Sequence, residues 1–234
     1  MNLAFFDVDQ TLYDGYCSRQ CFYYVAQKRG LTQLIAERKA LELQVKNNTI
    51  NQHQVTAHYM DLAAKTLADL SIEEVEQLTK TIIKTEGRFF PWVNQVIQHL
   101  REHQFRIYLV SAAIEPMIFS IAQHLKIEHF FATTLEVVDG VYTGSVTHLR
   151  NSHAKAEKIA DLIKEIAEDN NVVAFGDGPG DIPMLLAADQ AFVVHPVEFT
   201  EVILAEAAKQ GWPILQHKTA FQQVKQRLEE KFTL

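Results

Sequence analysis

Residues 3–12 read LAFFDVDQTL, and this stretch decides the class of fold. Its first four residues are apolar, which predicts a short buried strand of a parallel sheet over residues 3–6. Asp7 and Asp9 follow that strand directly. Two carboxylates crowded at the end of an apolar strand cost free energy unless a cation or a reaction uses them. An isolated pair of this kind is also typical of a solvated loop, so its meaning depends on the rest of the chain.

Further apolar runs with helical sequence around them indicate more strands of the same kind. They cover residues 106–110 and 172–175, and the run 191–194 is a candidate fourth strand. Strands that alternate with helices predict an α/β fold with a doubly wound parallel sheet. Residues 136–146 differ, because the dipeptide Asp139-Gly140 between alternating segments is a strong signal of a β-hairpin. We expect this hairpin at an edge or rim of the sheet.

The stretch between the first two predicted strands shows no strand pattern. Residues 16–86 read as consecutive helices with polar breaks near Gly30, residues 47–51 and Ser71. The segment Ser71-Ile72-Glu73-Glu74 matches a capping box, which marks a helix start. We therefore predict a core formed by residues 1–14 and 88–234, and an inserted helical domain at residues 15–87. Residues 87–91 would form the return linker.

Composition and charge restrict the classes of function. The 234 residues are 47% hydrophobic and 22% charged, as in ordinary globular proteins, which excludes disorder and coiled coil. The formal net charge of -7 argues against binding to nucleic acid and to anionic membrane surfaces, because no basic stripe is available to neutralise phosphates. No apolar run approaches the roughly 18–20 residues that span a bilayer, and the first residues lack the basic start of a signal peptide. Because only two cysteines are present, Cys17 and Cys21, we expect a cytoplasmic protein without a disulfide framework.

A hydroxyl and two very small residues, Ser111-Ala112-Ala113, follow the predicted strand 106–110. Small side chains at the end of a strand let backbone N–H groups approach an anion closely. The same pattern is usual for a turn or a helix cap, so alone it is a weak signal.

Lys155 breaks two local rules at once. It lies one turn before Ile159, on the inward stripe of a helix predicted over residues 153–168. It also lies near the N-terminus of that helix, where the macrodipole disfavours a cation. A nearby anion would hold the lysine there. The alternative is a lysine whose aliphatic stem covers apolar surface while its ammonium reaches solvent.

A glycine-rich turn, GDGPGD over residues 176–181, follows the predicted strand 172–175 and carries two further acids. Glycines permit tight backbone turns, and carboxylate oxygens are ligands that Mg²⁺ prefers. Ligands of open parallel sheets bind outside the carboxyl ends of the strands. The side chains that we expect to converge at this edge are Asp7, Asp9, Ser111, Asp177 and Asp181. Together with Lys155 they predict a site for Mg²⁺ and a phosphoryl group.

Four motifs, in this order, resemble those of the haloacid dehalogenase superfamily. They are residues 7–11 (DVDQT), Ser111, Lys155 and residues 176–181 (GDGPGD). The helical insertion after the first motif is similar to the C1-type cap of phosphoserine phosphatases, and residues 153–159 and 181–185 also resemble that branch, which is of subfamily IB type. The resemblance covers the whole α/β portion and implies a Rossmann-like core with a helical cap.

The resemblance also implies a role for each motif residue. Asp7 would be the nucleophile that forms an aspartyl-phosphate, and Asp9 would act as general acid and then as general base. The groups that would hold Mg²⁺ are Asp7, the Asp9 carbonyl and Asp177, with Asp181 as an auxiliary acid. The groups that would bind the phosphoryl oxygens are Ser111, the Ala112 N–H and Lys155. Lys155 would also orient Asp7.

The helical insertion departs from the phosphoserine phosphatases where those enzymes contact their substrate. At the position of a glutamate that binds the substrate amine, this chain has Tyr16, and a cap arginine that binds the carboxylate has no clear counterpart. An amino-acid headgroup needs a partner for both of its charges. The candidate substrate contacts in this region are Tyr16, Arg19 and Arg88.

The motifs and the resemblance together predict a Mg²⁺-dependent phosphomonoester hydrolase that acts on a small phosphorylated metabolite. Two alternatives stay open. One is a phosphoserine phosphatase whose substrate contacts come from other positions of the cap. The other is a non-catalytic phospho-receiver or binding module on a similar sheet. Asp9 and the large insertion speak against the receiver, which needs neither a general acid nor a substrate lid.

Overall fold

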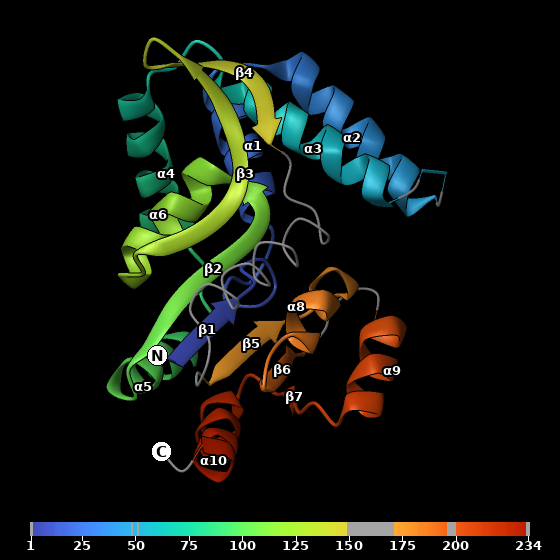
Figure 1. The fold of residues 1–234 in the computed structure, drawn as a ribbon. Helices are drawn as coiled ribbons and strands as arrows, with labels where there is room; N and C mark the ends of the chain where they lie inside the picture. Colours follow the sequence, from blue (N-terminus) through green and yellow to red (C-terminus); the bar gives the residue numbers. More distant parts are fainter. Residues whose placement is uncertain (1, 48, 51, 149–170, 196–199, 233–234) are drawn as a thin grey trace.

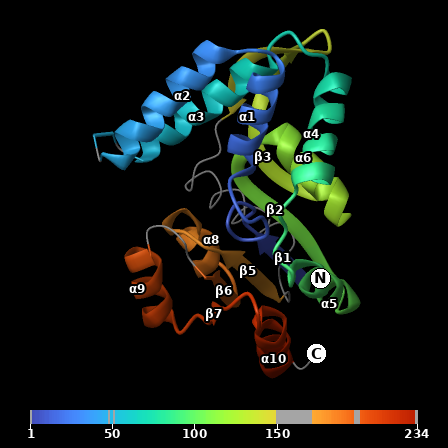
Figure 2. The same ribbon diagram turned by 180° about the vertical axis from the view of Figure 1, so that it is seen from behind.

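The computed structural model describes residues 2–47, 49–50, 52–148, 171–195 and 200–232. Within these ranges seven strands form one sheet in the order β4-β3-β2-β1-β5-β6-β7. Figure 1 shows β5, β6 and β7 with α8, α9 and α10 at one end of the molecule, and the β3–β4 hairpin with α1, α2, α3, α4 and α6 at the other. Figure 2 shows the same separation from behind.

The centre of the sheet is the parallel unit that the apolar runs predict. β1 (Asn2–Phe6) lies between β2 (Phe105–Ile114) and β5 (Val172–Gly176) and is parallel to both. β6 (Gln190–Val194) extends the sheet beyond β5, and the two-residue β7 (Ile214–Leu215) ends it. All four predicted strands are therefore confirmed.

β2 is longer than the sequence predicts. It continues through the Ser111-Ala112-Ala113 segment to Ile114, and its pairing with β3 shifts register between Val110 and Ile114. Two contacts from outside the strand fix this irregular segment. The Thr133 hydroxyl donates to the Ala112 carbonyl at 2.7 Å, and the Ile114 N–H donates to the Ser18 hydroxyl at 2.9 Å.

The predicted hairpin is confirmed and lies at the edge of the sheet. β3 (His129–Val138) runs parallel to β2, and β4 (Val141–His148) pairs antiparallel with β3 as the edge strand. Asp139 (φ 50°) and Gly140 (φ 79°) form the turn. Two positive φ angles are what a type I′ turn requires, and Asp-Gly is among the pairs that adopt it at low cost.

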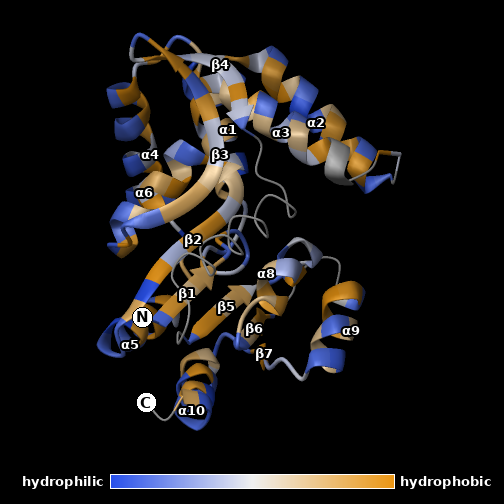
Figure 3. Ribbon diagram, viewed as in Figure 1, coloured by the Kyte–Doolittle hydropathy of each residue, from blue (hydrophilic) through white to orange (hydrophobic). Residues whose placement is uncertain are grey.

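Alternate side chains of the central strands face two separate apolar cores. Leu3 and Phe5 face a core that includes α8 (Ile182–Leu186) and α9 (Thr200–Gln210). Ala4 and Phe6 face the other core, which lies against α5 (Val93–Glu102), α6 (Glu115–Leu125) and α10 (Ala220–Phe232). Because both faces are covered, β1 from Leu3 onward and β5 consist of apolar residues and a final glycine (Figure 3).

A ladder of phenylalanines joins three neighbouring strands on the second face. The ring centroids of Phe6 and Phe175 lie 4.2 Å apart, and those of Phe175 and Phe192 lie 4.8 Å apart. All three side chains are fully buried. Burial of each contributes roughly 1.5–3 kcal/mol to the free energy of unfolding, so the ladder fixes the strand ends that carry the acids.

Four helices occupy the predicted helical insertion. They are α1 (Cys17–Lys28), α2 (Thr32–Lys46), α3 (Gln52–Leu67) and α4 (Ile72–Glu86). The capping box at the start of α4 is confirmed, because Ser71 and Glu74 each accept a hydrogen bond from the backbone N–H of the other. α1 packs on the other three helices, α3 on β4, and α4 on α6.

Backbone hydrogen bonds attach the loop between α3 and α4 to the start of β4. Ile72 N–H donates to the Gly140 carbonyl at 3.0 Å, and Tyr142 N–H donates to the Leu70 carbonyl at 2.9 Å. The Tyr142 carbonyl accepts from Asp69 N–H at 2.9 Å. The helical segment is therefore anchored to the hairpin as well as to the end of β1.

Within the described ranges, no helix has the length and apolar character needed to cross a membrane. Cys17 and Cys21 are both buried and free.

Candidate active site

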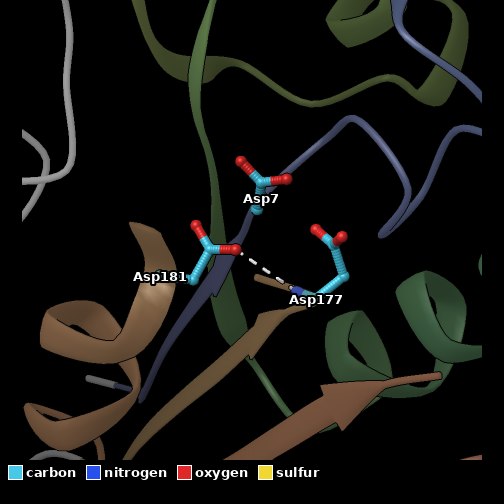
Figure 4. Close-up of side chains that lie close together, drawn as sticks. All are labelled: Asp7, Asp177 and Asp181. Carbon is cyan, nitrogen blue, oxygen red and sulfur yellow. Dashed lines mark hydrogen bonds between the residues drawn. The ribbon is translucent and has the colours of Figure 1, made fainter. Parts of the chain in front are cut away.

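Three aspartates meet at the carboxyl ends of β1 and β5. Asp7 follows β1, Asp177 follows β5, and Asp181 ends the short 3-10 helix η1 (Pro179–Asp181). One carboxylate oxygen from each lies within 4.8 Å of the other two. Figure 4 shows the three side chains pointing toward a common space. The cause is the sheet register, which pairs Phe6 with Phe175 and so ends the two strands side by side.

Hydrogen bonds fix two of these carboxylates. Asp181 Oδ2 accepts from the backbone N–H groups of Asp177 and Gly178, each at 3.2 Å (Figure 4 draws the first). The Thr11 hydroxyl donates to Asp177 Oδ1 at 3.3 Å. Thr11 belongs to the same loop as Asp7, so the first and last motifs of the sequence are joined directly.

The three acids are suited to a divalent cation. Asp7 is 6% exposed and Asp181 is 3% exposed, so water screens their charges poorly. Carboxylates this close repel one another unless a cation lies between them. Carboxylate oxygens are the hard ligands that Mg²⁺ prefers, and the spacing leaves them able to share one ion. The donor set therefore fits the predicted Mg²⁺.

Asp9 has different surroundings from the three clustered acids. Its Oδ1 accepts a hydrogen bond from the Cys17 N–H at 2.9 Å, at the first residue of α1. The positive end of a helix dipole favours a negative charge at this position. Burial raises the pKa of the Cys17 thiol well above its usual range, and the neighbouring Asp9 carboxylate raises it further. Asp9 thus connects the catalytic edge of the sheet to the helical segment.

Ser111 and Ala112 lie on the same cavity as the acids. The Ser111 hydroxyl is buried and accepts from Ala113 N–H at 3.1 Å, so it lies against the irregular part of β2. The structure therefore brings together six of the residues predicted from the four motifs: Asp7, Asp9, Ser111, Ala112, Asp177 and Asp181. Lys155 belongs to residues 149–170, which are outside the described residues.

The cavity has a volume of about 760 Å³ and lies between the sheet edge and the helical segment. Two of the three predicted substrate contacts, Tyr16 and Arg19, line it. Arg88 is exposed and is not among the described residues that line the cavity. Its carbonyl accepts a hydrogen bond from Asp14 N–H at 2.7 Å, which fixes the return linker to the first loop.

Arg38 on α2 lines the cavity and is absent from the sequence-based candidates. Its side chain is 4% exposed, and its guanidinium carbon lies 4.2 Å from the ring centroid of Tyr59 and 4.9 Å from that of Phe22. Nε pairs with Glu42 Oε1 at 3.2 Å, whereas Nη1 is buried without a hydrogen-bond partner in the described part of the chain. Burial lowers the pKa of Arg38, and Glu42 opposes that shift.

Glu42 holds several groups in place at once. Its Oε1 lies 3.0 Å from Arg19 Nε, and its Oε2 accepts from the Tyr23 hydroxyl at 3.1 Å and from Arg19 Nη2 at 3.2 Å. The sequence offers one hint of this cluster, which is the i, i+4 spacing of Arg38 and Glu42. On a mostly polar helix, that spacing is more typical of a solvated surface pair.

Comparisons with known proteins agree with this arrangement. The family model described as haloacid dehalogenase-like hydrolase matches residues 4–186. The phosphoserine phosphatase of Methanocaldococcus jannaschii is 29% identical over 199 residues, which are 83% of this chain and 87% of that protein. A structure of a phospho-aspartyl intermediate analogue of phosphoserine phosphatase superposes with a TM-score of 0.61 at 24% identity, over 89% of this chain and 98% of the other.

A protein of unknown function from Bordetella pertussis has a similar fold, with a TM-score of 0.77 at 19% identity over 92% of this chain and 98% of that one. The family match spans every described motif, from the strand before Asp7 to the helix after Asp181. The chain therefore belongs to the haloacid dehalogenase-like hydrolase family, in the phosphoserine-phosphatase-like branch of its phosphatases.

Proposed function

We propose that the chain is a Mg²⁺-dependent phosphomonoester hydrolase that acts on a small organic phosphate through an aspartyl-phosphate on Asp7. The observation that carries this proposal is the cluster of Asp7, Asp177 and Asp181, in which Asp7 and Asp181 are buried and Asp177 is half-buried. It opens onto one cavity with Asp9 and Ser111. Phosphoryl transfer needs a cation site, a nucleophile and a second acid that lies apart from the metal-binding carboxylates.

The reaction has two steps. A carboxylate oxygen of Asp7 attacks phosphorus, the bond from phosphorus to the ester oxygen breaks, and Asp9 gives its proton to the leaving alkoxide. Asp9 then takes a proton from water as the water oxygen attacks the phosphorus of the aspartyl-phosphate. The bond to Asp7 breaks, and inorganic phosphate is released. The hydrogen bond from Cys17 N–H keeps the Asp9 carboxylate at the cavity in both steps.

The remaining site residues bind the metal ion and the phosphoryl group. Asp7, the Asp9 carbonyl and Asp177 would hold Mg²⁺, with Asp181 fixed behind them by Asp177 and Gly178. When bound, the ion neutralises charge on the carboxylates and on the transferring phosphoryl group. The roles of Ser111, the Ala112 N–H and Lys155 are phosphoryl binding. Residues 15–87 act as a cap that closes one side of the cavity and excludes water from it.

Hydrolysis of p-nitrophenyl phosphate tests the proposal. Asp7→Asn preserves the shape of the side chain but removes the nucleophile, so kcat falls by about a thousandfold or more. Asp14→Asn is the matched control, because Asp14 lies in the same loop but is exposed, and it retains wild-type kcat. Chelation of Mg²⁺ abolishes activity, and addition of Mg²⁺ restores it. Full activity of Asp7→Asn would refute the mechanism.

Phosphoserine is a second candidate substrate, because the relative from Methanocaldococcus jannaschii is a phosphoserine phosphatase. Its recognition requires a cation for the carboxylate and an acid for the amine. In this cavity Arg38 is a cation and Glu42 an acid, although both Glu42 oxygens already accept from side chains of the protein. A strong preference for phosphoserine over phosphoethanolamine and glycerol phosphate would support this candidate, and equal rates on all three would exclude it.

A further inference from the structure

The side of the cavity that is lined by the helical segment, from Tyr16 to Met60, is called the cap wall below. It carries an excess of positive charge. Among the described residues of this wall, the ionisable groups with a full charge are Arg19, Arg38, Lys46 and Glu42. Three cations therefore face a single acid on the side away from the aspartates. The phosphoryl group lies at the aspartate edge in the proposed function, so the cationic wall faces the leaving group.

Glu42 is already engaged by the protein. Both of its oxygens accept from side chains, through Arg19, Arg38 and Tyr23. A substrate amine would have to displace at least one arginine to reach this carboxylate. The wall is thus poorly suited to a cationic group on the substrate.

Aromatic rings enclose the guanidinium of Arg38 at the wall of the cavity. Aromatic faces of Phe22, Tyr23 and Tyr59 surround its guanidinium, which restricts its rotation and removes it from water. Nη1 has no hydrogen-bond partner within the described ranges. A buried guanidinium N–H without a partner costs free energy that a second anion in the cavity would recover.

The wall is also long. The residues of α2 that line the cavity are Arg38, Glu42, Val45 and Lys46. Their i, i+4, i+7 and i+8 spacing places them along one face of the helix, and eight residues span about 12 Å at the usual rise. This length exceeds what the carbon chain of serine would occupy. Val45, Tyr59 and Met60 add apolar surface to the same wall.

We propose that the substrate is an elongated phosphomonoester whose leaving group carries a second anionic group, either a carboxylate or a phosphate, and that Arg38 binds this group. The inference rests on the proposed function and specifies its substrate class. An amine on the leaving group is not required, because Glu42 has no free position for it.

Two matched substrate pairs test the inference by steady-state kinetics. Fructose 1,6-bisphosphate and fructose 6-phosphate differ in one phosphate, and 6-phosphogluconate and sorbitol 6-phosphate differ in one carboxylate. In at least one pair, the wild type hydrolyses the more anionic member with a kcat/KM about tenfold or more above that of the other member. The pair that shows this preference tells whether the second anion is a phosphate or a carboxylate. Phosphoserine is not preferred over 3-phosphoglycerate.

Arg38→Met lowers the ratio of kcat/KM within that pair by about tenfold. Lys39→Met is the control, because Lys39 is an exposed cation on the same helix and does not line the cavity, and it leaves the ratio unchanged. Circular dichroism checks that Arg38→Met is folded. Lys46→Met, at the far end of the wall, is a second variant with the same expected direction.

Two outcomes would overturn the inference. One is a wild type without preference for the anionic member of either pair. The other is a ratio that neither Arg38→Met nor Lys46→Met lowers. Hydrolysis of p-nitrophenyl phosphate by the wild type separates these outcomes from failure of the proposed function. That reaction requires the aspartates, but the p-nitrophenyl group carries no carboxylate or phosphate for Arg38 to bind.

Discussion

Gly176 and Asp181 are in such close contact that only a glycine fits. A Cβ atom on Gly176 would lie 2.5 Å from Cβ of Asp181 and 2.9 Å from its Oδ2. Real Cβ contacts are never this short, and the carboxylate cannot retreat without losing its hydrogen bonds to Asp177 and Gly178. The last residue of β5 therefore determines where the third acid of the cluster lies.

Gly176→Ala should displace Asp181 from the aspartate cluster. We expect the concentration of Mg²⁺ needed for half-maximal hydrolysis of p-nitrophenyl phosphate to rise by about tenfold or more, because positions around a metal site typically affect its affinity by that amount. Gly178→Ala is the control, because a Cβ there meets no atom within 4 Å. An unchanged Mg²⁺ dependence in Gly176→Ala would show that Asp181 is dispensable for metal binding.

The two cysteines should be unreactive in the folded protein. Both side chains are fully buried, burial raises the pKa of Cys21 to about 12, and burial with Asp9 raises that of Cys17 well above its usual range. The thiolate is the reactive form. Iodoacetamide at pH 8 should therefore modify neither cysteine in the folded protein and both cysteines in protein unfolded by urea. Mass spectrometry of Cys21→Ser reports on Cys17 alone. Rapid native modification in that variant would contradict the close contact between α1 and Asp9.

His99 should make the folded state less stable in acid. Burial lowers the pKa of His99, His103 lowers it next, and Glu229 acts in the opposite direction. Below about pH 6.5 the unfolded chain binds a proton that the folded chain rejects, so the free energy of unfolding decreases as pH falls. Urea denaturation at pH 7 and pH 5 should show a smaller decrease for His99→Leu than for the wild type.

The control for this measurement is His148→Gln, which alters an exposed imidazole on β4 and should keep the wild-type pH dependence. An equal decrease in His99→Leu and the wild type would mean that other groups cause the acid sensitivity.

Gly144 should be required for the packing of β4 on α3. Its φ of +85° is unfavourable for other residues, and a Cβ there would lie 2.9 Å from Cβ of Ala68. We expect Gly144→Ala to lower the free energy of unfolding by about 2–4 kcal/mol, from backbone strain and overpacking together. Gly140→Ala in the same hairpin also has a positive φ (+79°) but meets no atom within 4 Å, so it should cost about 1–2 kcal/mol. If urea denaturation shows the same loss of unfolding free energy for both variants, backbone strain alone explains the effect of Gly144→Ala and overpacking against Ala68 contributes nothing.

The strands and the aspartate cluster could be predicted because their signals are local. Apolar runs mark β1 and β5, and the rule that parallel strands present ligands at their carboxyl ends brings Asp7 and Asp177 together. The β-hairpin and the capping box follow from short motifs of the same kind. Lys155 and the boundaries of the cap stay predictions.

Arg38 could not be predicted, because its surroundings come from three helices. Phe22 lies on α1 and Tyr59 on α3, and no periodicity within α2 reveals which of its polar residues those rings enclose. The sequence does not predict the extension of β2 through Ser111 for a similar reason. Small residues there have little preference for strand, and the conformation depends on Ser18 and Thr133, which are distant in sequence.

The attachment of the α3–α4 loop to β4 has a consequence for solubility. An open edge strand is a template to which a strand of another molecule can add, which leads to aggregation. Here the loop uses the outward backbone groups at Gly140 and Tyr142, and the opposite edge strand, β7, is only two residues long. The connection that anchors the helical segment thus also shields one end of the sheet from intermolecular pairing.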